Sequence, residues 1–590
     1  MGYRTLRHCI TDLRKTGQLG EYSEPVDPYL ELAAVQRRLY ENKAPAVLFT
    51  NVRNCQFPML ANLYGTQQRI EYIFRDGIEP LRKVMKYAAD FPASAISAVS
   101  KPSDWFGLLK SVYYSRPKQV SSRTAPVLQC KTTLDKLPQL VSWQNDGGAY
   151  ITLPQVLTQF PDCKRFGLTN LGMYRIQISG NDYIPNQECG LHYQIQRGIA
   201  LHHIEATKRG QPLRVNIFIG GAPCMTLAAI MPLPENVSEL LFAGILGQHR
   251  IPLAVPPLAA GYCCAEADFC ITGTLGTEMK TEGMFGDHLG YYSLQHGFPV
   301  MKVDGVWHRK DAVYPFTVVG RPPQEDTQFG KFIHGITGDS VEKKIPGVKA
   351  VNAVDEAGVH PLLLAAGRET YPNELHTLAH SILGFGQLSL AKYLFIAEDR
   401  SAAASTPQLN VHNVPEFFRY VLERVDWRKD VHFITETSMD TLDYTGGKLN
   451  SGSKVFIAAS GSPIRQLAAE LVPTLKKNLR VAMPGVLAAE NEEWKMENDV
   501  LQGFPLIVMV DNADEAVSSI RNFLWTTFTK SDPAADIHGI GEFTQNKHWG
   551  CTGPLIIDAR RKPHHAPELV EDPDVARRAE HIAERILTRS

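Results

Sequence analysis

The sequence predicts a mixed α/β fold in three parts: an N-terminal α/β region (residues 1–120), a central β-rich domain (121–330) and a C-terminal α/β domain (331–590). Three observations lead to this prediction. A chain of 590 residues is too long for one hydrophobic core, so two to four domains are expected. Short β-type runs separated by turn residues are concentrated in the middle of the chain. On both sides of that stretch, helical and extended patterns alternate, which is typical of α/β units.

The N-terminal region combines amphipathic helices with a short apolar run. Tyr29 to Tyr40 carries apolar residues at helical spacing, which predicts an amphipathic helix. The run from Pro45 to Val52 is apolar and bounded by turn formers, so we expect a buried strand. A further helix is expected near Glu79 to Ala89. The polar segment 114–126 contains prolines and serines and is typical of a domain linker.

The central region contains β-rich runs that alternate with turn residues. Arg214 to Gly220 and Asp268 to Leu275 are flanked by glycine, proline, asparagine or aspartate. One helix is expected to begin near Ser238, where Ser-Glu precedes an apolar run. We therefore expect a β-rich domain with a few inserted helices.

Beyond Pro323, strand-like runs again alternate with helical segments, which predicts a parallel α/β domain. The final segment, Pro573 to Ser590, is expected to form a charged amphipathic helix of the kind used for docking or oligomerisation. The expected strands lie within Leu390–Asp399, Asp430–Thr435, Ser453–Ser460, Leu479–Pro484 and Phe504–Asp511.

Composition narrows the classes of function. Lys and Arg (61) nearly balance Asp and Glu (62), and the formal net charge is −1. This balance gives no sign of nucleic acid or an anionic membrane as a partner. The N-terminus lacks the apolar core of a signal peptide, and the most apolar stretch, Val215 to Pro234, contains two glycines and three prolines. We expect a cytoplasmic protein without a membrane span.

The spacing of the cysteines and the absence of common catalytic motifs argue against several kinds of chemistry. None of the ten cysteines forms a CxxC pair, so we expect reduced, mostly buried thiols rather than a zinc site or a disulfide framework. The sequence has no GxxxxGK[ST], no GxGxxG after a strand, no HExxH and no GxSxG. Nucleotide hydrolysis, dinucleotide-dependent dehydrogenation, zincin proteolysis and α/β-hydrolase chemistry are therefore disfavoured.

Three stretches of the central domain concentrate acids, an arginine, glycines and aromatic residues: Thr169–Gln177, Met231–Gly244 and Thr281–Tyr292. Each is a weak signal when taken alone. Two acids in a glycine-rich loop usually belong to a solvated turn, and a single arginine is usually a surface ion-pair partner.

Taken together and in this order, these stretches closely resemble the UbiD family of prenylated-flavin-dependent decarboxylases. Motifs in the same order cover about the first 325 residues, and the C-terminal part matches loosely. The length resembles the longer members tied to menaquinone-type pathways. The motifs are Leu13–Leu39, Ala44–Gly65, Asp146–Pro154, Thr169–Arg175, Gly221–Glu239, Thr281–Tyr292 and Val318–Pro323.

The resemblance implies a central split β-barrel that binds prenylated FMN, and a C-terminal domain that contributes to oligomerisation and to the substrate pocket. It implies that Arg175, Glu282 and Asp287 are catalytic, and that Asn170 and Glu239 bind a divalent metal, usually Mn²⁺. Backbone near Ala228 and Met231 resembles a site that holds K⁺ in some members. The cofactor contacts that it implies are Met173, Tyr174, Arg175, His192, Tyr193, Gln194, Arg197 and Gly198.

Two positions depart from parts of the family. Arg197 stands where some members have a histidine as a third metal ligand, and Asp287 stands where the cinnamate-type members have glutamate. Both differences place the chain nearer the ubiquinone-type pattern.

The implied reaction is a reversible decarboxylation of an aromatic or α,β-unsaturated acid, through a covalent substrate adduct to prenylated FMN. A flavin prenyltransferase of the UbiX type would supply the cofactor, and a homo-oligomer (dimer or hexamer) is expected. Two alternatives stay open: a non-catalytic subunit of a UbiD-type carboxylase complex, and an ordinary FMN oxidoreductase on a split barrel. The spectrum and mass of the bound flavin separate the last from the first.

The residue types suit this chemistry. Losing CO₂ from an sp² carbon leaves a carbanion that the π system does not delocalise, so a cofactor must act as the electron sink. Arg175 can grip a carboxylate with two hydrogen bonds, and Glu282 can orient it. A proton donor at Asp287 requires a raised pKa, which desolvation beside the substrate would produce. Gly283 and Gly286 are expected to let this loop turn tightly.

Overall fold

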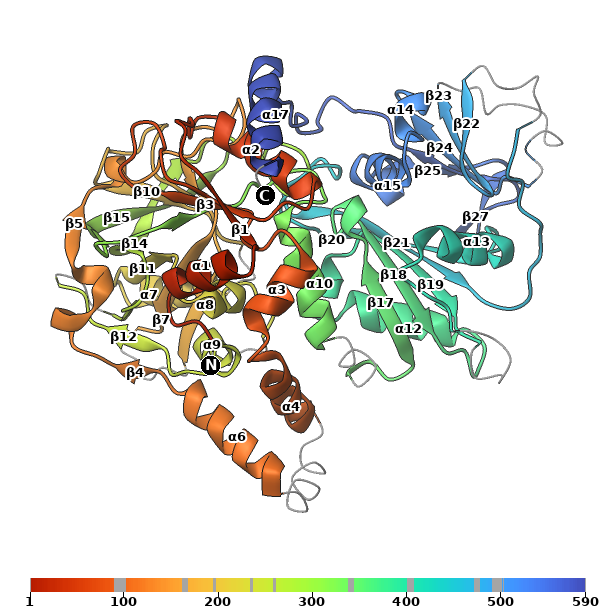
Figure 1. Cartoon of the computed structure of the whole chain (residues 1–590). Coiled ribbons are helices and arrows are strands. Elements are labelled where there is room, and N and C mark those ends of the chain that lie inside the picture. The colour runs from red at the N-terminus through yellow and green to blue at the C-terminus, as the bar shows by residue number, and fades with distance from the viewer. Residues whose placement is uncertain are drawn as a thin grey trace.

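A computed structural model describes residues 2–89, 102–161, 168–194, 198–233, 237–257, 261–337, 344–400, 408–471, 478–490, 501 and 503–588. The predicted fold class is confirmed. The N-terminal and central parts form one body, and the C-terminal part lies beside it (Figure 1). The last helix returns to the N-terminal region.

The N-terminal part is built on a four-stranded sheet that includes a strand from the central part. Its strand order is β1 (Leu19–Tyr22), β2 (Ala46–Phe49), β3 (Met59–Ala61) and β16 (Tyr314–Pro315). The predicted helix over residues 29–40 is confirmed as α2 (Glu31–Glu41), and the predicted strand over residues 45–52 as β2. The other helices are α1 (Leu6–Lys15), α3 (Gln67–Phe74), α4 (Ile78–Ala89) and α6 (Pro102–Ser115).

The central part is a nine-stranded sheet whose strands follow the order β6-β9-β10-β15-β14-β11-β7-β8, with β5 paired to β15. Its long strands are confirmed at both predicted runs, as β11 and β14. The bounds are β5 Cys130–Thr132, β6 Tyr150–Ile151, β7 Pro154–Gln159, β8 Thr169–Gly172, β9 Ile176–Gln177, β10 Glu188–Leu191, β11 Leu213–Ile219, β14 Phe269–Thr281 and β15 Gly297–His308.

The chain connection between β8 and β9 requires this sheet to curl. Six strand spacings separate β9 from β8 along the sheet, which is roughly 29 Å in a flat sheet. Only residues 173–175 join the end of β8 to the start of β9, a reach of at most about 14 Å. The sheet therefore bends into a half-barrel, and residues 173–175 cross its seam.

A short network of caps places helix α9 (Glu239–Gly247) against β8. The Ser238 hydroxyl accepts a hydrogen bond from the Leu240 N–H (3.3 Å), as expected for a helix that begins after this serine. The same hydroxyl lies 2.7 Å from Thr169 Oγ1 in β8. The link brings the first residue of α9 beside β8. The remaining elements here are α7 (Gly198–Lys208), α8 (Pro223–Ala228), β12 (Pro252–Ala254) and β13 (Cys263–Cys264).

The segment expected to be a linker, residues 114–126, holds more structure than the sequence suggested. It contains the end of α6, the short strand β4 (Lys118–Gln119) and two turns of 3₁₀ helix. β4 pairs with β12 in a three-stranded sheet. Its backbone groups therefore find partners in the central part.

The C-terminal part contains two five-stranded sheets rather than one. The first has the order β17-β18-β19-β21-β20 and the second β22-β23-β24-β28-β25. In each, the three central strands are parallel and both edge strands are antiparallel, so the predicted parallel sheet is correct only for the centres. The strands are β17 Val348–Ala353, β18 Leu362–Gly367, β19 Tyr393–Glu398, β20 Val431–Ser438, β21 Ser451–Ala459, β22 Leu479–Met483, β23 Val486–Glu490, β24 Leu506–Val510, β25 Ile537–Gly539 and β28 Leu555–Asp558.

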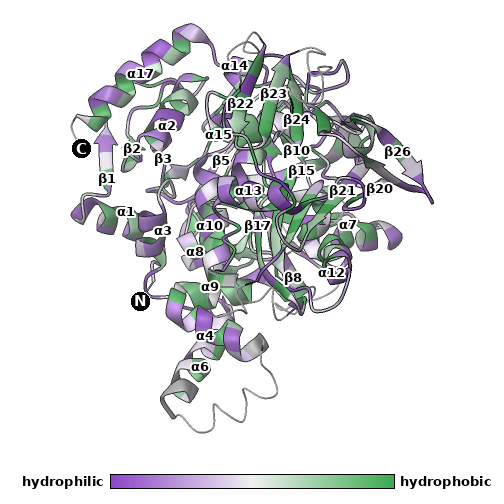
Figure 2. Cartoon of the chain, turned by 90° about the vertical axis from the view of Figure 1, so that its right-hand side faces the viewer, coloured by the Kyte–Doolittle hydropathy of each residue, from purple (hydrophilic) through white to green (hydrophobic). Residues whose placement is uncertain are grey.

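The two sheets share one hydrophobic core. Alternate residues of β18 point to opposite faces: Leu364 joins the core between the sheets, and Leu363 packs with helix α12 on the outer face. Figure 2 shows β23 and β24 coloured mainly as hydrophobic, as expected for strands covered on both faces. The helices are α10 (Glu325–Thr337), α12 (Glu374–Leu383), α13 (Val414–Arg424), α14 (Ala513–Ala516), α15 (Ile520–Thr529) and α16 (Pro533–Asp536), beside the hairpin β26 (Glu542–Gln545) and β27 (His548–Cys551).

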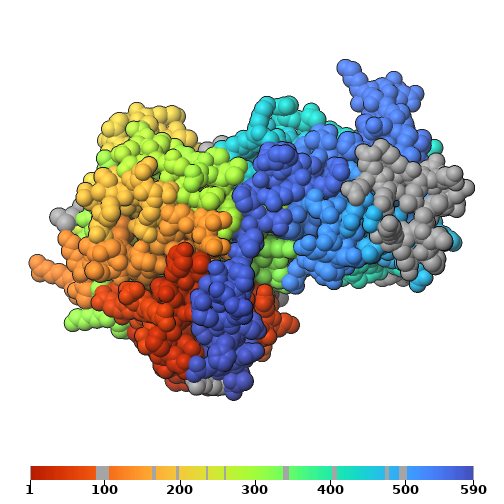
Figure 3. Space-filling model, turned by 90° about the horizontal axis from the view of Figure 1, so that it is seen from above, coloured from red at the N-terminus to blue at the C-terminus, as the bar shows by residue number. Residues whose placement is uncertain are grey.

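The final helix, α17 (Pro573–Leu587), lies against α2 at the other end of the sequence (Figure 3). Asp572 caps it by accepting from the N–H groups of Asp574 and Val575 (2.9 Å each). Arg38 of α2 donates two hydrogen bonds to Glu571 (2.7 Å each), and Arg578 pairs with Glu31 (3.2 Å). The predicted docking helix therefore docks onto its own chain.

The expectations about a membrane span and about the cysteines can be compared with the described residues. Within them, no helix is long and apolar enough to cross a membrane. The nine described cysteines are unpaired, and seven of them are buried, as predicted.

Candidate active site

Arg175 is the centre of a buried cluster of charged side chains. It lies in the seam between β8 and β9, and its side chain is 10% exposed. Its Nε and Nη2 atoms donate to the two carboxylate oxygens of Glu282, at 3.1 and 2.7 Å. Its Nη1 donates to Asp287 Oδ2. The structure thus brings together the three residues that were predicted to be catalytic.

Burial and mutual charge act in opposite directions on these three groups. Burial lowers the pKa of Arg175, but the charges of Glu282 and Asp287 outweigh it, so that pKa lies above its usual range. Burial raises the pKa of Glu282, but the charge of Arg175 and a hydrogen bond from His192 bring it down to about 2. All of these groups therefore carry charge at neutral pH.

The pKa of Asp287 differs from the raised value that a proton donor requires. Burial raises it, but the hydrogen bond from His288 and the charge of Arg175 outweigh burial, so the pKa lies below its usual value. His288 donates its backbone N–H to Asp287 Oδ1 (2.7 Å), and its Nδ1 lies 3.1 Å from the same oxygen. In this arrangement Asp287 is a carboxylate that accepts hydrogen bonds from Arg175 and from His288.

The loop that carries both acids is fixed by close packing. Gly283 and Gly286 do not have the left-handed backbone that a tight turn would need; the positive φ in this loop belongs to Gly290 (+90°). Their lack of a side chain instead permits close approach. A Cβ on Gly283 would lie 2.5 Å from Gly147 Cα, and one on Gly286 would lie 2.0 Å from the Trp143 ring.

Three residues that the sequence analysis did not assign complete the surroundings of Arg175. Ser293 Oγ accepts from Arg175 Nη2 (3.1 Å), and the guanidinium lies 4.9 Å from the ring centre of Phe285. Asp146 accepts a hydrogen bond from the Gly286 N–H (2.8 Å), and burial raises its pKa to about 6. Asp146 and Phe285 lie within motifs on which the family resemblance rests, so the resemblance could have pointed to these two residues.

The residues expected to contact a flavin lie along the same seam. Met173 and Tyr174 precede Arg175, and the Tyr174 ring meets the Tyr193 ring edge-on, with centroids 6.4 Å apart. His192 Nδ1 lies 2.9 Å from Glu282 Oε2, and burial lowers the pKa of this histidine. His192 therefore connects the expected flavin contacts to the Arg175 cluster.

The rest of the expected flavin set surrounds the start of α7. Gln194 and Gly198 are described, whereas Arg197 lies outside the described residues. A Cβ on Gly198 would lie 2.2 Å from the Asn170 Oδ1 atom. Glycine at this position therefore keeps the side-chain oxygen of Asn170 accessible from the start of α7.

The two residues expected to bind a metal lie next to each other across β8 and α9. Glu239 Oε2 accepts a hydrogen bond from the Leu171 N–H (2.8 Å), and Leu171 follows Asn170 in β8. Burial raises the pKa of Glu239 to about 7, and within the described residues no ion-pair partner contacts it. A carboxylate and an amide oxygen on neighbouring elements, with no cation of the described residues paired to the carboxylate, fit a hard divalent ion.

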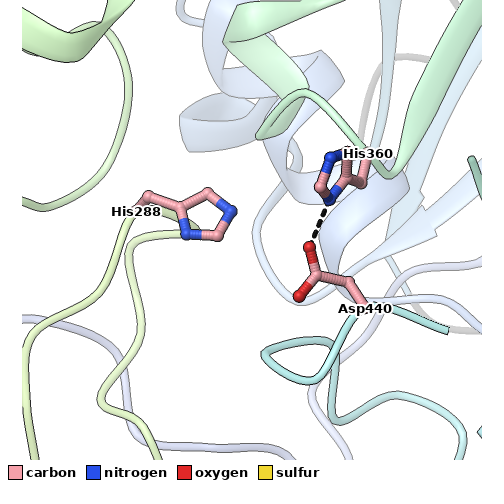
Figure 4. A group of neighbouring side chains, drawn as sticks. All are labelled: His288, His360 and Asp440. Atoms are coloured by element: carbon pink, nitrogen blue, oxygen red, sulfur yellow. Dashed lines mark hydrogen bonds and ion pairs between the residues drawn. The ribbon is translucent and has the colours of Figure 1, made fainter. Parts of the chain in front are cut away.

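A second group of polar side chains was not predicted. His288, which follows Asp287, faces His360 and Asp440 from the C-terminal part, and the potential ligand atoms of the three lie within 4.8 Å of one another (Figure 4). Residues so far apart in the sequence leave no local pattern, so only the fold could reveal the group.

Sequence comparisons identify the family. Models of three domains of 3-octaprenyl-4-hydroxybenzoate carboxy-lyase (UbiD) match the chain: the N-terminal domain over residues 10–88, the Rift-related domain over 118–322 and the C-terminal domain over 327–459. A protein of Chlamydia pneumoniae described as a 4-hydroxybenzoate decarboxylase subunit is 36% identical over 580 residues, covering 96% of this chain and 96% of its own length. An uncharacterized protein of Archaeoglobus fulgidus is 30% identical and covers 78% of this chain and 92% of its own length.

Solved structures share the fold. The closed form of the vanillic acid decarboxylase of Sedimentibacter hydroxybenzoicus has a TM-score of 0.66 at 21% identity, over 80% of this chain and 96% of that chain. An evolved dimeric form of the UbiD-class enzyme HmfF of Pelotomaculum thermopropionicum, in complex with prFMN, has a TM-score of 0.60 at 20% identity, over 80% and 98%. With the three domain matches and relatives above 30% identity over most of the chain, the protein belongs to the UbiD family of carboxy-lyases.

Proposed function

We propose that this chain is a prenylated-FMN-dependent decarboxylase of an aromatic acid, and that Arg175, Glu282 and Asp287 perform the reaction with it. The observation that carries the proposal is the buried Arg175 guanidinium, which two carboxylates hold beside the expected flavin contacts. The substrate class is supported by the relatives: a 4-hydroxybenzoate decarboxylase subunit, a vanillic acid decarboxylase and 3,4-dihydroxybenzoic acid decarboxylases. A hydroxylated benzoic acid is therefore the first candidate.

The cofactor would occupy the seam of the half-barrel. When bound, prenylated FMN supplies the electron sink that a carboxylate on an sp² carbon lacks. The residues proposed to hold it are Met173, Tyr174, Arg175, His192, Tyr193, Gln194, Arg197 and Gly198. Asn170 and Glu239 would hold Mn²⁺, whose preference for oxygen ligands suits a link between the protein and a phosphate. The backbone near Ala228 and Met231 is proposed as a K⁺ site because it resembles the site that holds K⁺ in some members of the family.

The guanidinium of Arg175 would bind and orient the substrate carboxylate. Nη1 now contacts Asp287, while Nε and Nη2 are held by Glu282. A substrate carboxylate can take over Nη1 while Glu282 keeps the guanidinium plane in place. That exchange frees Asp287 from its ion pair and leaves it desolvated beside the bound carboxylate, which would raise its pKa so that it can take up a proton from water. It would then deliver this proton to the product carbon as CO₂ leaves. The same steps in reverse give carboxylation.

The chain is proposed to work with two kinds of partner. A flavin prenyltransferase of the UbiX type would make the cofactor. A second copy would form a homo-oligomer, and α6 offers exposed apolar area for such contacts through Trp105, Phe106, Leu109, Val112 and Tyr113. The relative described as a decarboxylase subunit favours a place in a larger complex. A non-catalytic subunit would have no need for the Arg175 cluster, so we assign the catalytic role to this chain.

The test is to express the chain with and without a flavin prenyltransferase and to analyse the bound pigment by mass and absorbance. With the prenyltransferase, we expect prenylated FMN and CO₂ release from 4-hydroxybenzoate, vanillate or 3,4-dihydroxybenzoate. Without it, we expect FMN or no flavin, and no decarboxylation. Full activity with FMN alone would contradict the cofactor assignment. Prenylated FMN bound in full, without solvent deuterium exchange into any aromatic product tested, would favour the non-catalytic subunit.

A further inference from the structure

The cluster of His288, His360 and Asp440 joins two parts of the molecule beside the proposed catalytic residues. His288 belongs to the loop of the central part that carries Asp287, whereas His360 precedes β18 and Asp440 follows β20 in the C-terminal part. Asp440 is 2% exposed, and the two histidines are half-buried. Each residue offers one ligand atom, and these atoms all lie within 4.8 Å of one another.

His288 is held so that one ring nitrogen is directed at the other two residues. Its Nδ1 lies 3.1 Å from Asp287 Oδ1, which leaves the second ring nitrogen to face outward. Figure 4 shows that this second nitrogen faces the His360–Asp440 pair. Histidines that bind metals usually have this arrangement, in which one nitrogen binds the ion and the other contacts a carboxylate.

The charge around the cluster favours a cation. Asp440 hydrogen bonds through Oδ2 to His360 Nδ1, and its Oδ1 accepts from the Leu442 N–H (3.0 Å). Burial lowers the pKa of His288, but the hydrogen bond to Asp287 and the charges of Asp287 and Asp440 raise it to about 9, and a bound ion would replace the proton on its second ring nitrogen. The nearby cation Arg175 is already occupied by Glu282 and Asp287.

We propose that His288, His360 and Asp440 bind a divalent transition-metal ion of the zinc type, separate from the ion proposed at Asn170 and Glu239. Two imidazole nitrogens and one carboxylate oxygen are a common ligand set for such ions, at about 2.0–2.2 Å, and they leave one position for water or a substrate oxygen. Ligand atoms at these distances in a tetrahedral site lie about 3.4 Å apart, so binding needs His288 to move closer to the other two residues, and it replaces the hydrogen bond between His360 and Asp440, whose atoms must separate.

Such an ion would act as a cross-link and as a positioning device. It would tie the loop of Asp287 to the C-terminal sheet, because its ligands come from both parts. It would also hold the His288 ring, whose other nitrogen contacts Asp287. The proposal does not rest on the proposed reaction, since ion binding can be measured without any turnover.

The test uses the full chain, stripped with a chelator and titrated with Co²⁺, whose visible spectrum reports nitrogen and oxygen ligands, followed by displacement with Zn²⁺. In the wild type we expect one equivalent of Co²⁺ at this cluster, with the ligand-field spectrum of nitrogen ligands, beside any Co²⁺ that binds the oxygen ligands of Asn170 and Glu239. Affinity should fall by more than about 100-fold in His360→Gln and in Asp440→Asn. Glu239→Gln should keep this spectrum, which separates the two proposed ion sites.

A matched control removes a histidine of the same part from outside the cluster. His376 packs against His432, with ring centroids 4.4 Å apart, and His376→Gln should leave the Co²⁺ spectrum and affinity unchanged. Zn²⁺ should raise the melting temperature of the wild type and not that of His360→Gln, whose folding without metal is checked by circular dichroism. If His360→Gln does not fold, His288→Gln takes its place. Absence of binding, equal binding in the cluster variants, or loss of binding in His376→Gln would each overturn the proposal.

Discussion

Glu282 and Glu239 are two carboxylates of the central part that differ in where their positive charge comes from. Burial raises the pKa of both. For Glu282 the charge of Arg175 and the hydrogen bond from His192 outweigh burial, and the pKa is about 2. For Glu239 the described partners are backbone N–H groups, and the pKa is about 7. The first carboxylate has its cation within the chain, whereas no cation of the described residues pairs with the second, which is what the proposed metal site requires.

The comparison assigns different tasks to the two sites. A carboxylate with a permanent cationic partner can hold that partner in one orientation, as Glu282 holds the guanidinium with two hydrogen bonds. A buried carboxylate without one gains most from an ion that also reaches a ligand. Under the proposed function, Glu282 would act on the substrate through Arg175, and Glu239 would act on the cofactor through a metal.

Removing the cation from the first site should have the largest effect. Arg175→Met leaves Glu282 and Asp287 buried without a charged partner, so we expect no measurable decarboxylation and a loss of about 3–5 kcal/mol in the free energy of unfolding. Arg175→Lys keeps the charge but not the planar fork, so it should recover stability more than activity. Denaturant titration and CO₂ release check both. A Met variant as stable as the wild type would show that Arg175 is not the cation that stabilises the two buried carboxylates.

The second largest effect is expected at Asp287. Asp287→Asn preserves the shape of the side chain but cannot take up and deliver a proton, and loss of a general acid commonly costs about 10²–10⁴ in rate. Flavin and manganese content should stay normal, since among the described residues Asp287 is bonded to one proposed flavin contact, Arg175, and to neither proposed manganese ligand. Solvent deuterium incorporation into the product is the measurement. Wild-type exchange in a folded, flavin-loaded variant would leave Asp287 as a structural residue that anchors His288.

The pH dependence of stability should reveal Glu282. Its folded-state pKa is lowered, so its contribution is fully present above the unfolded value of about 4.5 and is lost as pH falls from there through about 2. The shift corresponds to a contribution on the order of 3 kcal/mol. Unfolding measured between pH 5 and pH 2 should be steeper for the wild type than for Glu282→Gln. Identical slopes would mean that the ion pair with Arg175 does not stabilise the fold.

The smallest of these effects is expected for the second carboxylate. Glu239→Gln should abolish manganese binding and lower flavin content, while the metal-free protein should unfold at a similar temperature. In the wild type, Mn²⁺ at 100 times its dissociation constant should add about 2.7 kcal/mol to the free energy of unfolding, and the variant should lose this increment. Metal analysis with thermal unfolding provides the measurement. Unchanged manganese in the variant would remove Glu239 from the metal site.

The sequence was most informative where the residues of a motif also lie close together in the fold. Arg175, Glu282 and Asp287 were predicted together, and the structure joins them because β9, β10, β15 and β14 are consecutive neighbours in one sheet. The individual strands of the C-terminal part were predicted from their apolar runs. Their division into two sheets was not, because periodicity reports which face is buried and not which strand lies beside it.

Features that depend on contacts across the chain were missed. The group of His288, His360 and Asp440 combines residues from two parts of the molecule. The sequence around each of these residues does not distinguish it from an ordinary histidine or aspartate. The glycines of the Asp287 loop were predicted to serve a turn and instead allow the Trp143 ring and Gly147 to approach. Such close approaches are properties of packing, which local patterns do not encode.

The contact between α17 and α2 has a consequence for how the protein is made. About 530 residues separate the two helices, so at about 5–20 residues per second the ribosome reaches α17 roughly half a minute to two minutes after α2 has emerged. Throughout that time the α2 surface that later receives Val575, Ala579 and Ile586 has no cover. A nascent chain of this protein therefore offers chaperones a binding surface on α2 until α17 has been synthesised.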